Sequence, residues 1–151
     1  MRRSRALMAV AVVLPLAVPA LAKDLATGLR GTWMLDKVAM LEADPPPFYK
    51  LATPEKKKEI QQKMLKEMPD ISMEFTATTA TMTAGKDVQP ARYTVTRSEK
   101  STVWVELVPQ AKNGAAAAPK AEKYTFEFVD PDTLKMGHEG EAGTMTLKRK
   151  K

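Results

Sequence analysis

The chain has 151 residues, no cysteine, and 24 basic against 18 acidic side chains, which give a formal net charge of +6. This length suits one domain with one core, and the absence of cysteine excludes disulfides, thiol nucleophiles and cysteine-ligated metals. Basic residues are not clustered among aromatic ones, so we expect no nucleic-acid partner.

The first 22 residues have the pattern of a cleaved signal peptide. Three arginines lie within residues 1–5, residues 6–18 are apolar, and residues 19–22 read PALA. The apolar run is interrupted by Pro15 and is too short to span a bilayer. No cysteine follows the cleavage point, so a lipid anchor is not expected. We therefore predict a periplasmic or secreted protein whose residues 23–151 form a single domain.

The first strand-like segment is Gly31–Met40, with the sequence GTWMLDKVAM. Its alternation places Trp33 and Leu35 on one face, and the same parity would place Lys37 inside. A buried lysine in a strand is unfavourable. The segment therefore either contains a bulge near Asp36 or leaves the sheet in its second half.

A connector and one helix follow this strand. Prolines 45–47 predict an extended connector, and Thr53 followed by Pro54 predicts a helix start. The helix should end near Met68, before Pro69. Its apolar stripe consists of Ile60, Met64, Leu65 and Met68.

The surface of this helix is rich in lysine, which allows two interpretations. It could lie on an anionic membrane surface. More often such a helix packs its apolar stripe on a core and leaves its lysines in water, and we favour this second interpretation over membrane contact.

From Ile71 onward the hydrophobic period is two. The residues expected to face inward are Met73, Phe75, Ala80, Met82, Ala91, Tyr93, Val95, Val103, Val105, Leu107, Tyr124, Phe126, Phe128, Leu134, Met136, Met145 and Leu147. A low-complexity segment, residues 109–121, separates two of the strands as a loop. The pattern predicts a mainly β fold: a small eight-stranded antiparallel up-and-down barrel with one helix inserted between strands one and two.

Trp104 lies on the outward face of its predicted strand. An outward tryptophan indicates that some other part of the chain covers it. The helix could do so, or it could instead cap one end of the barrel.

The segments GTW at residues 31–33, FEFVDPDTL at 126–134 and MTLKR at 145–149 resemble those of secreted bacterial lipocalin-like proteins. The resemblance implies that Gly31 and Trp33 form the closed base of the barrel and that Arg149 packs across the indole. Strand pairing agrees, because the first and last strands of a closed barrel are neighbours. The inserted helix differs from lipocalins, whose helix typically follows the barrel.

Catalytic chemistry is not indicated by any motif. His138 lies in the segment GHEGE, residues 137–141, which predicts a flexible loop and a poor metal site. Nucleophile elbows and phosphate loops are absent. We expect no enzyme activity, catalytic residue, metal or cofactor.

Two functions remain. The barrel could bind a small hydrophobic molecule, with these candidate ligand-binding residues: Phe48, Tyr49, Met64, Phe75, Met82, Tyr93, Val95, Phe126, Phe128 and Met136. In that case residues 48–49 and the helix would form a lid. Alternatively, the same large side chains fill the barrel, and the protein is a structural module that interacts with an envelope protein.

Overall fold

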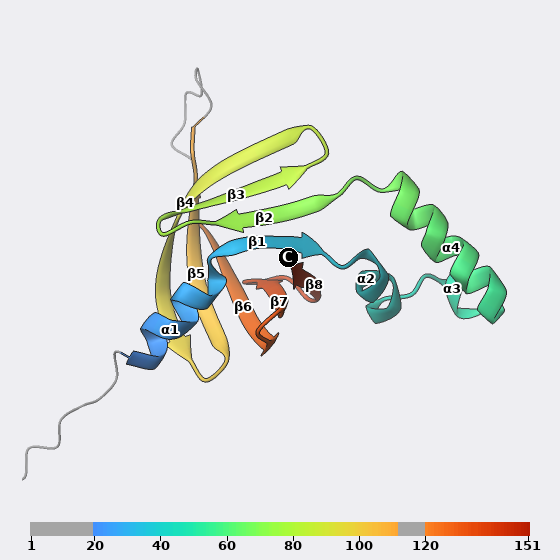
Figure 1. Cartoon of the computed structure of the whole chain (residues 1–151), viewed down its shortest axis with the longest axis horizontal. Coiled ribbons are helices and arrows are strands. Elements are labelled where there is room, and N and C mark those ends of the chain that lie inside the picture. The colour runs from blue at the N-terminus through green and yellow to red at the C-terminus, as the bar shows by residue number, and fades with distance from the viewer. Residues whose placement is uncertain (1–19, 112–119) are drawn as a thin grey trace, which may run out of the picture.

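Eight antiparallel strands form a closed barrel in the computed structural model, which describes residues 20–111 and 120–151 (Figure 1). Each strand pairs with the next along the chain, and β1 also pairs with β8. The strands are β1 (Gly31–Leu35), β2 (Ile71–Phe75), β3 (Thr79–Ala84), β4 (Asp87–Glu99), β5 (Thr102–Pro109), β6 (Glu122–Asp130), β7 (Thr133–His138) and β8 (Thr144–Arg149). The predicted fold class is confirmed.

A helix that the sequence pattern did not predict precedes the barrel. α1 (Ala20–Leu29) begins inside the predicted signal peptide, most of which, residues 1–19, lies outside the described part of the chain. Residues 112–119 of the predicted alanine-rich loop also lie outside it. α1 lies against β4 and β5, and Leu29 at its end is fully buried in the barrel core. This end of the barrel is therefore closed.

The first strand leaves the sheet at Asp36. This is the second of the two alternatives predicted for residues 31–40. The Asp36 side chain accepts a hydrogen bond from the backbone N–H of Ala39 at 2.9 Å and caps α2 (Lys37–Ala43). The alternative of a bulge near Asp36 was wrong, because this cap begins a helix there. Lys37 is indeed buried, but its ammonium is satisfied by the Met68 carbonyl at 2.7 Å and the Asp70 carboxylate at 2.8 Å.

Three helices, rather than the single predicted one, connect β1 to β2. α2 is followed by α3 (Pro47–Lys50) and α4 (Pro54–Glu67), and we call this connection the helical arm. α4 has the predicted start, with the Thr53 side chain accepting from the Lys56 N–H at 3.4 Å, and it stops before Pro69. Of the prolines at 45–47, Pro46 keeps an extended backbone as the N-cap, and Pro47 begins α3, because proline suits a first helical turn.

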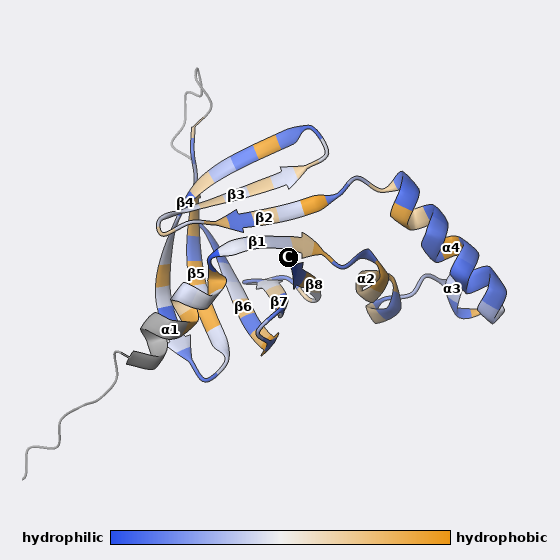
Figure 2. Ribbon diagram, in the orientation of Figure 1, coloured by the Kyte–Doolittle hydropathy of each residue, from blue (hydrophilic) through white to orange (hydrophobic). Residues whose placement is uncertain are grey.

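The helical arm extends away from the barrel, which corrects both predicted positions of α4 (Figures 1 and 2). α4 lies against α2 and buries none of its residues fully. Its stripe residues Ile60, Met64 and Met68 are only half-buried, and Leu65 is exposed. The stripe thus packs within the arm, where Gln61 donates to the Tyr49 hydroxyl at 2.7 Å.

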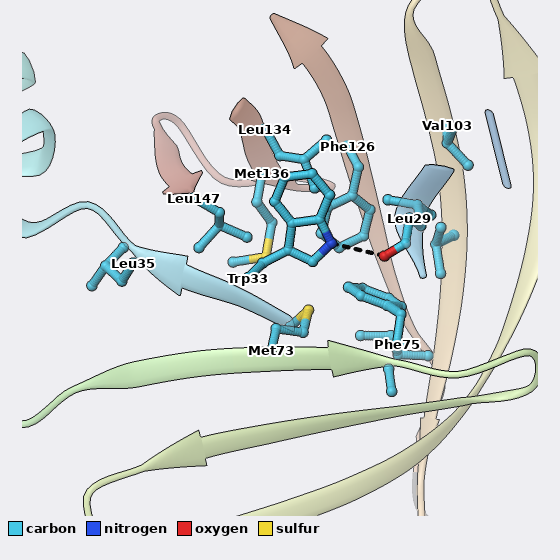
Figure 3. Packing of buried hydrophobic residues seen from close by; sticks show 13 residues of the cluster. Leu29, Trp33, Leu35, Met73, Phe75, Val103, Phe126, Leu134, Met136 and Leu147 are labelled. Atoms are coloured by element: carbon cyan, nitrogen blue, oxygen red, sulfur yellow. Dashed lines mark hydrogen bonds between the residues drawn. The ribbon is translucent and has the colours of Figure 1, made fainter. Parts of the chain in front are cut away.

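Large apolar side chains fill the closed half of the barrel (Figure 3). The largest fully buried ones are Trp33, Phe126, Leu29, Leu134, Val103 and Val105. Phe75 meets Phe126 edge to face, with ring centroids 5.3 Å apart, and meets Tyr93 in the same way. This half is a packed apolar core.

Candidate ligand-binding cavity

The opposite half of the barrel contains a cavity of about 210 Å³. Its wall is predominantly apolar and comes from seven strands, β2 to β8. The lining residues are Met73, Ala80, Met82, Gln89, Pro90, Ala91, Leu107, Pro109, Glu122, Tyr124, Met136 and Met145. The strand ends that surround it lie away from α1, so we call this the open end of the barrel.

Cross-strand pairs place the methionines of the wall. Met73 on β2 is directly opposite Met82 on β3, and Met136 on β7 is directly opposite Met145 on β8. Strand alternation turns all four toward the interior, on the same face as neighbouring core residues. Met73 and Met136 are buried, whereas Met82 and Met145 are exposed at the rim.

Two polar side chains meet at the rim of the cavity. The Tyr124 hydroxyl donates to Glu122 Oε2 at 2.8 Å. Burial of the phenol and the adjacent Glu122 carboxylate raise the pKa of Tyr124 to about 12. The rim therefore presents a neutral phenol bound to a carboxylate rather than a free proton donor.

Of the ten candidate ligand-binding residues, only Met82 and Met136 line this cavity. Phe75 and Phe126 belong to the packed core, and Tyr93, Val95 and Phe128 pack against it. Their parity was predicted correctly. The alternation shows which side chains face the interior, but it does not show which end of the barrel those side chains fill.

The proposed lid residues lie in the helical arm and do not line the cavity. Phe48 is 65% exposed, and Tyr49 is buried within the arm under the Lys57 ammonium, 5.4 Å from the ring centroid. Met64 is half-buried on α4. The arm is therefore not a lid for the cavity in this structure.

Several cavity residues were not predicted as site residues, although most of them were predicted to face inward. Met73, Leu107, Tyr124 and Met145 were all predicted to point inward. Leu107, Tyr124 and Met145 lie toward the ends of β5, β6 and β8 at the open end, whereas Met73 is the direct partner of Trp33 and lies between the core and the cavity. That distinction needs the strand register.

The closed end has the geometry expected for Trp33 and Arg149. These residues are directly paired between β1 and β8, and the guanidinium carbon lies 4.2 Å from the indole centroid. The indole Nε1 donates to the Leu29 carbonyl at 2.7 Å (Figure 3). Arg149 also donates to the carbonyls of Gly28 at 2.8 Å and Arg30 at 2.9 Å. The pair thus ties α1 to the barrel.

His138 was predicted to lie in a flexible loop. It is instead the last residue of β7. Its ring meets Tyr124 edge to face, with centroids 4.8 Å apart, because the two residues are paired across β6 and β7. Its Nδ1 is buried and lies 3.6 Å from Glu141 Oε1, beyond hydrogen-bond distance. In residues 20–111 and 120–151, no group of three His, Asp or Glu side chains could hold a metal ion.

A second hollow of about 450 Å³ lies beside Trp104, mostly on the outer face of β4 to β7. Arg97 stacks on Trp104 with its guanidinium carbon 4.6 Å from the ring centroid, so the outward tryptophan is covered by an arginine and not by α4. The hollow is wider and more open to solvent than the cavity at the open end. We regard the cavity at the open end, whose wall is more apolar, as the better candidate for ligand binding.

No protein-family model, curated protein or solved structure matches the chain. Among the described helices, none is long and apolar enough to cross a membrane. The case for a function therefore depends on the geometry of the barrel.

Proposed function

We propose that the chain is an exported lipocalin-like protein that binds a small apolar molecule in the cavity at the open end of the barrel. The observation that carries this proposal is the division of the barrel into two halves. The half around Trp33 is tightly packed, whereas the half around Met82 and Met136 leaves about 210 Å³ between apolar side chains. An apolar space open at one end is suited to a hydrophobic ligand.

The volume of the cavity limits the ligand. Pockets that enclose drug-sized molecules are about 300 Å³ or larger. A cavity of about 210 Å³ holds a single ring system or part of an alkyl chain, and a molecule with a second linked ring would extend past the rim into solvent. The flexible methionines Met82 and Met145 at the rim can adapt to more than one shape.

The rim disfavours anionic ligand groups. Glu122 places a carboxylate beside the opening, and its hydrogen bond to Tyr124 keeps that phenol from donating elsewhere. A carboxylate on the ligand would be repelled there, whereas a neutral or cationic end would be accommodated. The ligand class is therefore a small apolar molecule without an acidic group near the rim.

Binding can be tested with the fluorescent apolar probe N-phenylnaphthylamine. Ala91→Phe on β4 places a large ring in the cavity wall, because Ala91 lines the cavity. We expect this variant to lose probe binding. The matched control is Thr94→Phe, which adds the same ring to an exposed position on the same strand and should bind as the parent protein does.

Thermal unfolding of both variants shows whether each remains folded. If the parent protein binds no probe, or if Ala91→Phe binds it unchanged while folded, the proposal is wrong. The barrel would then be a structural module that interacts with an envelope protein. Native mass spectrometry of the protein purified from its own envelope would identify a natural ligand.

A further inference from the structure

Four thioether side chains line the cavity at the open end: Met73, Met82, Met136 and Met145. They form two direct cross-strand pairs, one between β2 and β3 and one between β7 and β8. Directly opposed side chains on antiparallel strands have Cβ atoms about 5 Å apart. The sulfur atoms of each pair are therefore within reach of a common ligand.

Each pair contains an inner and an outer sulfur. Met73 and Met136 are 6% and 7% exposed, and their side chains lie in the barrel interior (Figure 3). Their partners Met82 and Met145 are 36% and 41% exposed. An ion arriving from solvent can thus meet the outer sulfurs first and be enclosed by the inner ones.

Methionine is concentrated at this cavity and not in the rest of the barrel core. The buried core that the structure describes contains two methionines, Met73 and Met136, and both line the cavity. The closed half is filled by leucine, valine and aromatic side chains instead. Leucine would provide the same apolar surface, so the thioether sulfur is the chemical property that distinguishes this wall.

Thioether sulfur is a soft ligand that selects Cu(I) over the hard cations Mg²⁺ and Ca²⁺. We propose that Met73, Met82, Met136 and Met145 bind one soft monovalent cation, Cu(I) or its analogue Ag(I), at the open end of the barrel. The carboxylate of Glu122, on the same wall, attracts a cation and offsets its charge. This site uses the sulfur atoms rather than the apolar character of the cavity, so it does not depend on the function proposed above.

The probe for this site is Ag(I), which has the same preference for sulfur and is stable in air. We expect saturable binding of one Ag(I) per chain. The binding can be measured by NMR of the protein labelled with ¹³C at the methionine methyl groups. The methyl signals of the four cavity methionines should shift together. Those of Met34 on the outer face of β1 and of Met64 on α4 should not.

The double variant Met82→Leu with Met145→Leu removes the two exposed sulfurs and keeps similar apolar volume. We expect Ag(I) binding to weaken by about tenfold or more, equal to about 1.4 kcal/mol. The control Met34→Leu with Met64→Leu removes the same number of sulfurs elsewhere and should bind Ag(I) as the parent does. Equal affinity in both double variants, or equal shifts at all methionines, would overturn the proposal.

The same variants separate this inference from the proposed function. Replacing methionine by leucine should leave N-phenylnaphthylamine binding in place, since the wall stays apolar. Probe binding without specific Ag(I) binding would reject only the cation site. Specific Ag(I) binding without probe binding would reject only the apolar ligand.

Discussion

Arg149 lies over Trp33 across the β1–β8 pair that closes the barrel, with 4.2 Å between the guanidinium carbon and the indole centroid. The same guanidinium binds the carbonyls of Gly28 and Arg30, and the indole binds the carbonyl of Leu29. One pair of side chains therefore joins the first strand, the last strand and α1. A guanidinium over an indole contributes about 0.5 to 2 kcal/mol, in addition to these hydrogen bonds.

Replacing Trp33 by alanine should lower the free energy of unfolding by about 3 to 5 kcal/mol, as large core truncations do. The reason is that Trp33 is fully buried and fills the closed half of the barrel. The measurement is urea unfolding followed by circular dichroism. Trp104→Ala is the matched control, because Trp104 is only half-buried on the outer face. Its replacement should lower the free energy of unfolding by less. Equal losses for the two variants would show that Trp33 is not the base of the core.

Replacing Gly31 by alanine should destabilise the protein for two reasons. Gly31 has φ of +117°, where alanine is strained by about 1 to 3 kcal/mol. An added Cβ would also lie 3.0 Å from Nη1 of Arg149 and would disturb its position over Trp33.

Gly143 provides a control for the strain alone. Its φ is +113°, and an added Cβ would have no atom within 4 Å. Gly143→Ala should therefore cost less than Gly31→Ala in the same unfolding experiment, and the difference measures the crowding of Arg149. A larger loss for Gly143→Ala would contradict this explanation.

The Tyr124 phenol should titrate at about pH 12, above its ordinary pKa of 10.0. Its neutral form is favoured in the folded state, so its contribution to stability is fully present below pH 10. That contribution declines as the pH rises from 10 toward 12. Ultraviolet titration of the parent protein, compared with its Tyr124→Phe variant, follows this phenol.

Glu122→Gln removes a carboxylate that raises this pKa and should move it down toward 10. Burial, the larger cause, remains, so the change should be partial. Glu127→Gln alters an exposed carboxylate on the same strand and serves as the control. An unchanged Tyr124 pKa in Glu122→Gln would show that the two groups are not in contact in solution.

The pKa of Asp70 lies below its ordinary value of 3.8, because the Lys37 ammonium donates a hydrogen bond to it and attracts its charge. A depressed carboxyl pKa stabilises the fold above pH 3.8, and this contribution is lost as the pH falls through the lower folded-state value. NMR titration of the Asp70 carboxyl carbon measures this shift. In Lys37→Met the pKa should return toward 3.8, and an unchanged pKa would contradict the assigned cause.

The hydrophobic alternation was sufficient to predict the barrel, because a strand with one buried face repeats every two residues. The packing of Arg149 on Trp33 was expected from the resemblance to lipocalin-like proteins, and closure of an up-and-down barrel agrees with it. The helix start at Thr53 and Pro54 was predictable from local capping chemistry.

Other features depend on tertiary context. α2 was not predicted because the alternation of Trp33 and Leu35 was extended beyond Asp36, its N-cap. α1 was not predicted because its first residues overlap the predicted signal peptide. Most of the predicted site residues do not line the cavity: Phe75 and Phe126 point inward as Met136 does but lie in the filled half. Which half of a barrel is filled depends on the register and the side-chain volumes of all eight strands together. The sequence of a single strand does not determine it.

The buried Lys37 has a consequence for the modularity of the chain. Its ammonium binds the Met68 carbonyl and the Asp70 side chain, so it joins the two ends of the helical arm beside the barrel. There Met34 and Ser72 already pair between β1 and β2. The arm thus occupies the place of a hairpin turn, and a short turn substituted for it should leave the barrel able to close.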